Sequence, residues 1–133
     1  MRDVFCYGSL RVPAVWRHVT AANPPGLPAK VRGYRRWRVR GETYPAMVEA
    51  PLHEVDGWLW RGVDDAALAR LDAFEGDEYR RITLLAEPLG AAPCPAEAWL
   101  FVAGARIDHR PWDYDEFLAD ALPAFLARHC AGD

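Results

Sequence analysis

The sequence predicts an α+β protein: a small mixed, mostly antiparallel β-barrel with flanking helices. Stretches typical of strands mostly follow one another, and the two long helical patterns lie between two strands and after the last one. The regular alternation of strand and helix that a doubly wound parallel sheet requires is missing. We therefore expect the sheet to curl around a pocket.

Six strands are expected, at residues 3–7, 29–40, 44–49, 55–61, 79–87 and 97–102. The first alternates weakly and ends at Gly8, and the second mixes arginines with aromatics, so that its polar side faces solvent. Gly57 in the fourth marks a bulge or a close approach of two backbones. Prolines predict a loop at residues 88–95 and mostly irregular structure over residues 11–28, with one helical turn near Val15 to Val19.

Two helices are expected. The first begins at a cap formed by Asp64 or Asp65, carries an apolar stripe of leucines, and ends at Gly76, which we expect in the left-handed conformation. The second spans residues 114–130 with an apolar stripe along one side, and Pro123 should kink or split it.

The chain has 133 residues, 51% of them hydrophobic, which predicts a single domain over residues 1–133. A domain of this length buries roughly 65–70% of the surface of its unfolded chain. The formal net charge of −3 argues against nucleic acid or an anionic membrane as a partner, because both favour a basic face.

No apolar run approaches the roughly 20 residues that span a bilayer, and the N-terminal sequence does not resemble a secretory leader. The three cysteines make an odd count without CxxC spacing, which argues against a disulfide framework. We expect a cytoplasmic protein with reduced thiols that acts as a monomer or homodimer.

The first candidate site is the sequence Tyr7-Gly8-Ser9-Leu10, where the first strand ends. A glycine after a strand lets the backbone turn and expose successive N–H groups, which bind carboxylates or phosphates. The alternative is an ordinary turn at a strand end. The sequence is not a P-loop, because it lacks Gly-Lys-Ser/Thr.

The second candidate is Glu75, at the end of the first predicted helix. Its place four residues after Leu71 turns the carboxylate toward the edge of the buried face. Partial loss of water favours the neutral form and brings the group toward the strength of a general base. The alternative is a glutamate in solvent, or one paired with Arg80 or Arg81.

Four neighbours of these sites, Tyr79, Arg80, Arg81 and Arg11, could each contribute to a pocket or have an ordinary structural role. Tyr79 either hydrogen-bonds a substrate or is a core residue with its hydroxyl at the pocket rim. Arg80 and Arg81 should point to opposite faces of their strand, one paired with an acid and the other solvated. Arg11 is expected in solvent rather than at the mouth of a pocket.

Metal binding and nucleophilic catalysis are not expected. The four histidines are far apart in the sequence, without HxH or HxxxH spacing. A nucleophilic Ser9 would need a histidine base and a GxSxG elbow, and Cys6 lies inside a strand. We therefore expect neither a metal nor an organic cofactor.

Six segments, in order, resemble one family: Val4–Arg11, Tyr44–Met47, Val55–Trp60, Leu71–Gly76, Tyr79–Arg81 and Ala98–Val102. Their ordered combination resembles the gamma-glutamylcyclotransferase-like family, especially its small branch with gamma-glutamylamine cyclotransferases and plant avirulence-induced-gene proteins. The chain departs from that branch at Val12–His18, where many members carry a glycine followed by an Asn-His pair. This segment flanks the pocket mouth, so the specificity for the leaving group is left open.

The resemblance implies a small mixed barrel with flanking helices and a pocket for a small-molecule gamma-glutamyl substrate. It implies that Tyr7, Gly8, Ser9 and Leu10 form the loop whose backbone N–H groups hold the glutamyl carboxylate. It also implies that Glu75 is the catalytic acid/base and that Tyr79 lies beside the pocket.

The reaction implied is cyclisation of a gamma-glutamyl amine or peptide to 5-oxoproline, with release of the free amine and without a cofactor. Two alternatives stay open. One is a biosynthetic enzyme that removes a gamma-glutamyl group from an unusual amine. The other is a non-catalytic small-molecule binding module on the same fold.

Overall fold

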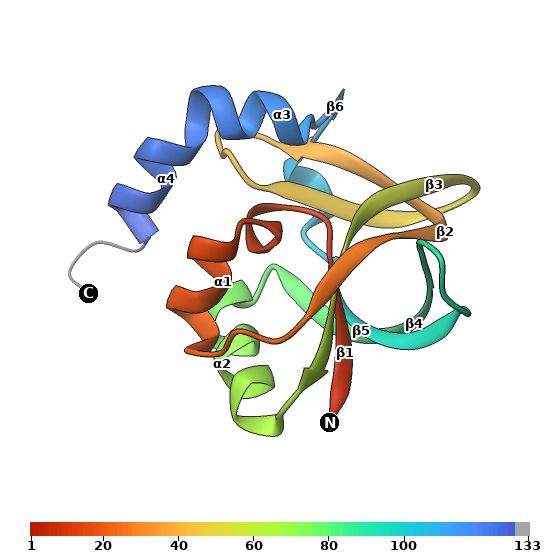
Figure 1. The fold of residues 1–133 in the computed structure, drawn as a ribbon. Coiled ribbons are helices and arrows are strands. Elements are labelled where there is room, and N and C mark those ends of the chain that lie inside the picture. Colours follow the sequence, from red (N-terminus) through yellow and green to blue (C-terminus); the bar gives the residue numbers. More distant parts are fainter. Residues whose placement is uncertain (130–133) are drawn as a thin grey trace.

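A computed structural model describes residues 1–129 and shows a β-barrel with helices packed mainly along one side (Figure 1). The strands are β1 (Arg2–Cys6), β2 (Gly26–Val39), β3 (Pro45–Val63), β4 (Tyr79–Pro88), β5 (Cys94–Phe101) and β6 (Ile107–Pro111). Five close in the order β3-β1-β5-β4-β2, with β2 pairing back to β3, and β6 adds to the edge of β2. The β1–β5 pair is parallel and the other described pairs are antiparallel. The expected α+β barrel is confirmed.

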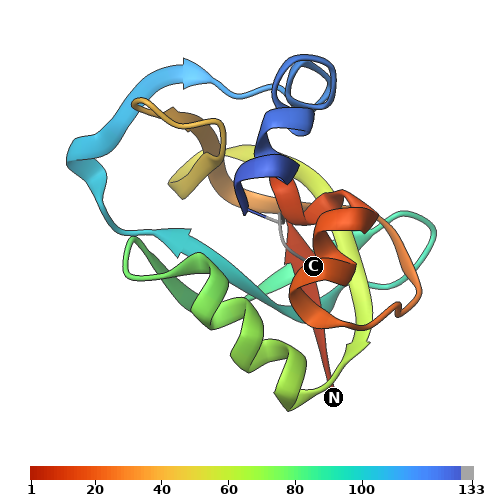
Figure 2. The same cartoon turned by 90° about the vertical axis from the view of Figure 1, so that its left-hand side faces the viewer.

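The helices are α1 (Pro13–Thr20), α2 (Asp65–Glu75), α3 (Tyr114–Glu116) and α4 (Leu122–His129). Two 3-10 turns, η1 (Ser9–Arg11) and η2 (Gly104–Arg106), and a π turn, η3 (Phe117–Ala121), complete the described elements. Helices α1 and α2 pack together beside the barrel, as Figure 2 shows. Within residues 1–129, no helix is long and apolar enough to cross a membrane.

Strand β1 is buried on both faces, because the barrel encloses one face and the helices cover the other. Phe5 and Tyr7 belong to the cluster inside the barrel, and Val4 and Cys6 to the cluster under the helices. Gly57 of β3 lets β1 come close: a Cβ there would collide with the Cys6 carbonyl oxygen and lie 2.7 Å from Phe5 Cζ. The expected close approach at Gly57 is confirmed.

The expectation of separate strands at residues 44–49 and 55–61 is wrong, because both lie in the single strand β3. The ladder between β2 and β3 shifts register between Arg32 and Tyr34. Residues 50–53 bulge out of the ladder at this shift, and the bulge bends the strand without ending it. Pro51 therefore suggests an interruption between two strands, although the backbone continues through it as one strand.

The helical turn expected near Val15 to Val19 is confirmed but is too short, because α1 begins at Pro13 and runs to Thr20. Pro13 occupies the first turn of this helix, where its missing N–H is harmless and its fixed φ suits a helix. Val15 and Trp16 are then completely buried. Strand β6 is absent from the sequence prediction because its sequence is polar, with Ile107 as its one buried residue.

The ends of the predicted helices are well defined in the structure. Asp64 caps α2 by accepting a hydrogen bond from the Ala67 N–H at 2.8 Å. Gly76 ends α2 with a positive φ of 73°, although its ψ of −163° lies outside the expected left-handed helical region. The π turn η3 directly before α4 confirms an interruption near Pro123, which lacks the N–H of a regular helix. Residue 130 of the expected helix lies outside the described residues.

Candidate active site

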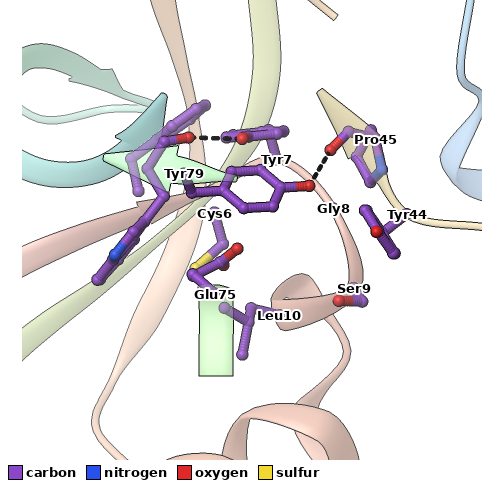
Figure 3. A pocket seen from close by; sticks show the side chains of 11 residues that line it. Cys6, Tyr7, Gly8, Ser9, Leu10, Tyr44, Pro45, Glu75 and Tyr79 are labelled. Carbon is purple, nitrogen blue, oxygen red and sulfur yellow. Dashed lines mark hydrogen bonds between the residues drawn. The ribbon is translucent and has the colours of Figure 1, made fainter. Parts of the chain in front are cut away.

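One pocket lies where the end of β1, the turn η1 and the last residue of α2 meet (Figure 3). Its lining consists of Phe5, Cys6, Tyr7, Gly8, Ser9, Leu10, Tyr44, Pro45, Glu75, Tyr79 and Trp99. All six residues that the sequence analysis singled out, Tyr7, Gly8, Ser9, Leu10, Glu75 and Tyr79, are among them. The fold therefore brings the glycine turn and the helix-end carboxylate into one site, and their roles in binding and catalysis stay predictions.

Gly8 turns the chain from β1 into η1. A Cβ on Gly8 would lie 2.8 Å from Cδ and Cγ of Pro45, so a larger residue would force the turn and Pro45 apart. The turn is closed by a hydrogen bond from the Arg11 N–H to the Gly8 carbonyl at 3.0 Å. At its start, the N–H groups of Ser9 and Leu10 donate to no acceptor in residues 1–129, as is usual for the first turn of a helix. They are donors available to an anion.

Two arginines stabilise the outer side of this turn. Arg36 of β2, with 13% of its side chain exposed, donates from Nη1 to the carbonyls of Tyr7 and Asp56, both at 2.9 Å. The guanidinium of Arg11 lies 3.8 Å from the ring centroid of Tyr114. The expectation that these two arginines lie in solvent is wrong, and nothing in the sequence separates them from their exposed arginine neighbours.

Glu75 is the last residue of α2, and its carboxyl group points into the pocket near the ring of Tyr79 and the sulfur of Cys6 (Figure 3). Burial, with a smaller contribution from the charge of Asp72, raises the pKa of Glu75 to about 8. In the described part of the chain, no group donates a hydrogen bond to this carboxyl, and Arg81 lies by Asp72 instead, at 3.6 Å. Glu75 is half-buried at the pocket and is not paired with an arginine, and its carboxyl is mostly protonated near pH 7.

The hydroxyl groups of two pocket tyrosines donate to backbone carbonyls. Tyr7 donates to the Trp99 carbonyl at 2.5 Å and Tyr79 to the Pro45 carbonyl at 2.8 Å. Burial raises the pKa of both hydroxyls, so both keep their protons at neutral pH. Because each proton is already donated, the phenolic oxygens have only acceptor capacity left for a bound molecule.

The thiol of Cys6 is also part of the pocket wall. Burial, and then the neighbouring Glu75, raise the pKa of this thiol, which keeps it neutral and a poor nucleophile. Among the described residues that line the pocket there is no histidine to activate Cys6 or Ser9. The arrangement thus favours acid–base chemistry at Glu75 over covalent catalysis.

The residue-by-residue sequence analysis did not single out Trp99 and Tyr44, which also line the pocket. Trp99 is 4% exposed on β5, and its indole Nε1–H donates to Asp72 Oδ1 at 3.0 Å. From the sequence alone, a tryptophan in an apolar strand that lines a pocket cannot be distinguished from one that packs in the core. Both residues lie in segments that resemble the family, and this resemblance was the one sequence feature that could have indicated their place in the pocket.

The family model described as gamma-glutamyl cyclotransferase, AIG2-like, matches residues 4–117. Protein AIG2 C of Arabidopsis thaliana is 37% identical over 82 residues, which cover 62% of this chain and 50% of that protein. Protein AIG2 A of the same plant is 29% identical over 127 residues, covering 93% of this chain and 74% of that protein. The chain spans about half the length of AIG2 C and of AIG2-like protein A, which it also matches.

Solved structures share the fold. A solution structure of an Arabidopsis thaliana protein superposes with a TM-score of 0.74 at 29% identity, covering 96% of this chain and 78% of that one. A structure described as gamma-glutamyl cyclotransferase superposes with a TM-score of 0.72 at 15% identity, covering 98% of this chain and 86% of that one. At this low identity the similarity shows the fold alone. Because the family model covers most of the sequence, the chain belongs to the gamma-glutamyl cyclotransferase, AIG2-like family.

Proposed function

We propose that this protein cyclises a gamma-glutamyl amine or peptide to 5-oxoproline and releases the free amine, with Glu75 as the general acid/base. The observation that carries the proposal is the Glu75 carboxyl, whose pKa of about 8 suits proton exchange with amines near neutral pH. It lies in one pocket with the open N–H groups of Ser9 and Leu10. Membership of the gamma-glutamyl cyclotransferase, AIG2-like family supports the same reaction.

The donors and acceptors of the pocket suit the two charged groups of a glutamyl substrate. Its α-carboxylate fits the N–H groups of Ser9 and Leu10, as backbone donors at a turn bind anions. Its α-ammonium fits Glu75 and the phenolic oxygens of Tyr7 and Tyr79, which accept hydrogen bonds. The positive charge of the bound ammonium stabilises ionised Glu75, so the substrate itself converts the buried carboxyl to its basic form.

The reaction is an intramolecular attack of the α-amine on the gamma-carbonyl. Glu75 takes a proton from the ammonium, the freed amine forms a C–N bond with the gamma-carbon, and a five-membered ring closes. The ring nitrogen keeps one of its three protons, and the other two pass through Glu75 to the leaving nitrogen as the old C–N bond breaks. The amine departs as an ammonium ion, and Glu75 returns to its starting state.

The nucleophile and the electrophile belong to the same molecule, so the main task of the pocket is to fold the substrate into a reactive shape. Proton transfer by Glu75 then lowers the barriers of ring closure and departure. This chemistry needs no metal or organic cofactor. The buried walls from Cys6 and Trp99 exclude water from the reacting atoms.

The test is 5-oxoproline release from a panel of gamma-glutamyl amino acids, gamma-glutamyl amines and glutathione. Wild type is compared with Glu75→Gln and with Asp77→Asn, an exposed carboxylate two residues further on and outside the pocket. We expect turnover by wild type and Asp77→Asn and a loss of about 10²-fold or more in Glu75→Gln. Equal turnover by Glu75→Gln would overturn the assignment of Glu75.

The same panel separates the proposed function from its alternatives. Release from only one unusual amine would identify a biosynthetic enzyme that removes a gamma-glutamyl group from that amine. Thermal stabilisation by 5-oxoproline, with no turnover of any donor, would identify a binding module on this fold.

A further inference from the structure

Asp72 lies on α2 one helical turn before Glu75, and its carboxylate connects this helix to the barrel. Its Oδ1 accepts the hydrogen bond from Trp99 Nε1 at 3.0 Å, and the Nε of Arg81 lies 3.6 Å from the same oxygen. Trp99 comes from β5 and Arg81 from β4. Two neighbouring strands therefore hold the end of α2 that carries Glu75.

The hydrogen bond to Trp99 continues into the pocket. Trp99 is 4% exposed and lines the same pocket as Glu75. Its carbonyl oxygen accepts the Tyr7 hydroxyl at 2.5 Å. The path from Asp72 through Trp99 to Tyr7 thus links α2, which ends at Glu75, with the pocket wall that follows β1.

The charges around Glu75 come from few groups. Cys6 of β1, Tyr7 directly after it and Tyr79 of β4 face it, and Tyr44 lines the same pocket; all are neutral near pH 7, and burial raises the pKa of each. On the η1 side, the charge of Arg11 acts on Cys6.

Asp72 adds its negative charge from the helix that carries Glu75 itself. This charge comes second to burial in raising the pKa of Glu75. The side chain of Asp72 is 44% exposed and Arg81 lies beside it, so solvent and this guanidinium screen the charge. The effect of Asp72 on Glu75 is therefore modest.

We propose that Asp72 is a positioning residue for Glu75, which it serves in two ways: its hydrogen bond to Trp99 fixes the end of α2 against the pocket wall, and its charge acts on the Glu75 carboxyl one turn away. This inference rests on the proposed role of Glu75 as acid/base. It assigns a function to an aspartate that lies outside the pocket lining and touches no substrate.

Substitutions separate the two effects. Asp72→Asn removes the charge and keeps an acceptor for Trp99, whereas Trp99→Phe removes the donor and keeps the charge. Asp65→Asn, in the first turn of the same helix, is the matched control for loss of one negative charge from α2. Arg81→Gln removes the cation that screens the charge of Asp72, so it should shift the Glu75 titration in the opposite direction to Asp72→Asn.

Two measurements are made on each variant. The first is a ¹³C NMR titration of the Glu75 carboxyl, assigned by its absence in Glu75→Gln, together with the indole N–H resonance of Trp99. The second is the pH profile of kcat for 5-oxoproline release from the best donor of the panel. The NMR titration needs no turnover, so it tests the charge effect even if no donor reacts and the proposed function fails.

For Asp72→Asn we expect the Glu75 titration midpoint to fall by about half a pH unit, with the Trp99 resonance in place. Asp65→Asn should leave the midpoint unchanged and Arg81→Gln should raise it. Trp99→Phe should lower the plateau kcat by roughly three- to tenfold, the value of one hydrogen bond. An unchanged midpoint in Asp72→Asn, an equal shift in Asp65→Asn, or a wild-type plateau in Trp99→Phe would overturn the proposal.

Discussion

Replacing Glu75 with glutamine should make the protein more stable at alkaline pH, because the buried carboxyl opposes folding once it ionises. The folded-state pKa is about 8, above the ordinary value of 4.5 that applies to the unfolded chain. Between these pH values the unfolded chain releases the proton and the folded protein retains it. By linkage, the free energy of unfolding contributed by Glu75 is complete below pH 4.5 and is lost as the pH rises to 8.

The size of the effect follows from the two pKa values. At about 1.36 kcal/mol for each pH unit, wild type loses up to about 5 kcal/mol of unfolding free energy across this window. Glutamine has the shape of the protonated acid and does not ionise, so Glu75→Gln lacks this loss. The total free energy of unfolding of a domain is roughly 5–15 kcal/mol, so the difference between the two proteins is large.

Urea denaturation followed by circular dichroism at half-unit steps from pH 4.5 to 9 measures this difference. We expect the two curves of unfolding free energy against pH to meet near pH 4.5 and to separate steadily, with Glu75→Gln the more stable protein at pH 8. Asp77→Asn, which removes an exposed carboxylate, should follow wild type. A constant difference between wild type and Glu75→Gln across this range would refute the argument that Glu75 is buried and neutral.

Three other substitutions test the walls of the pocket. Gly8→Ala should raise KM for the donor with little change in kcat, because its Cβ would lie 2.8 Å from Pro45 side-chain atoms, and steady-state kinetics measure this. Tyr79→Phe removes the donor to the Pro45 carbonyl, and denaturation should show a loss of about 1 kcal/mol with a higher KM. Arg36→Met removes the hydrogen bond to the Tyr7 carbonyl, so denaturation should show a loss of roughly 1–3 kcal/mol of unfolding free energy. The same variant should raise KM more than it lowers kcat. Wild-type values in any of these variants would contradict the role given to that residue.

The sequence predicted the barrel because its strands carry clear patterns of burial. The weakly alternating residues 3–7 predict a strand, and the structure buries Val4–Tyr7 in two cores; Gly57 marks the contact between β1 and β3. The same patterns failed where a local signal has two physical meanings. Pro13 breaks a helix in its interior but suits a helix start, and a proline such as Pro51 is compatible with both a loop and a bulge.

The position of Glu75 was predictable because helical spacing relates it to the buried face of α2. Its pKa was predictable in direction but not in size, since burial depends on walls such as Trp99 that arrive from a distant strand. Arg36 was not predictable as a support of the pocket, because its hydrogen bond to the Tyr7 carbonyl exists only in the tertiary structure.

The central claim is that Glu75, with its raised pKa, is the acid/base of a cyclotransferase, and the pH dependence of kcat/KM for 5-oxoproline release tests it most directly. For the best donor, kcat/KM reports the ionisation of the free enzyme. We predict a rise of about tenfold per pH unit that levels off near pH 8, and in Glu75→Gln a flat profile at least about 10²-fold lower. A break near pH 4.5, or a variant as active as wild type, would contradict the claim.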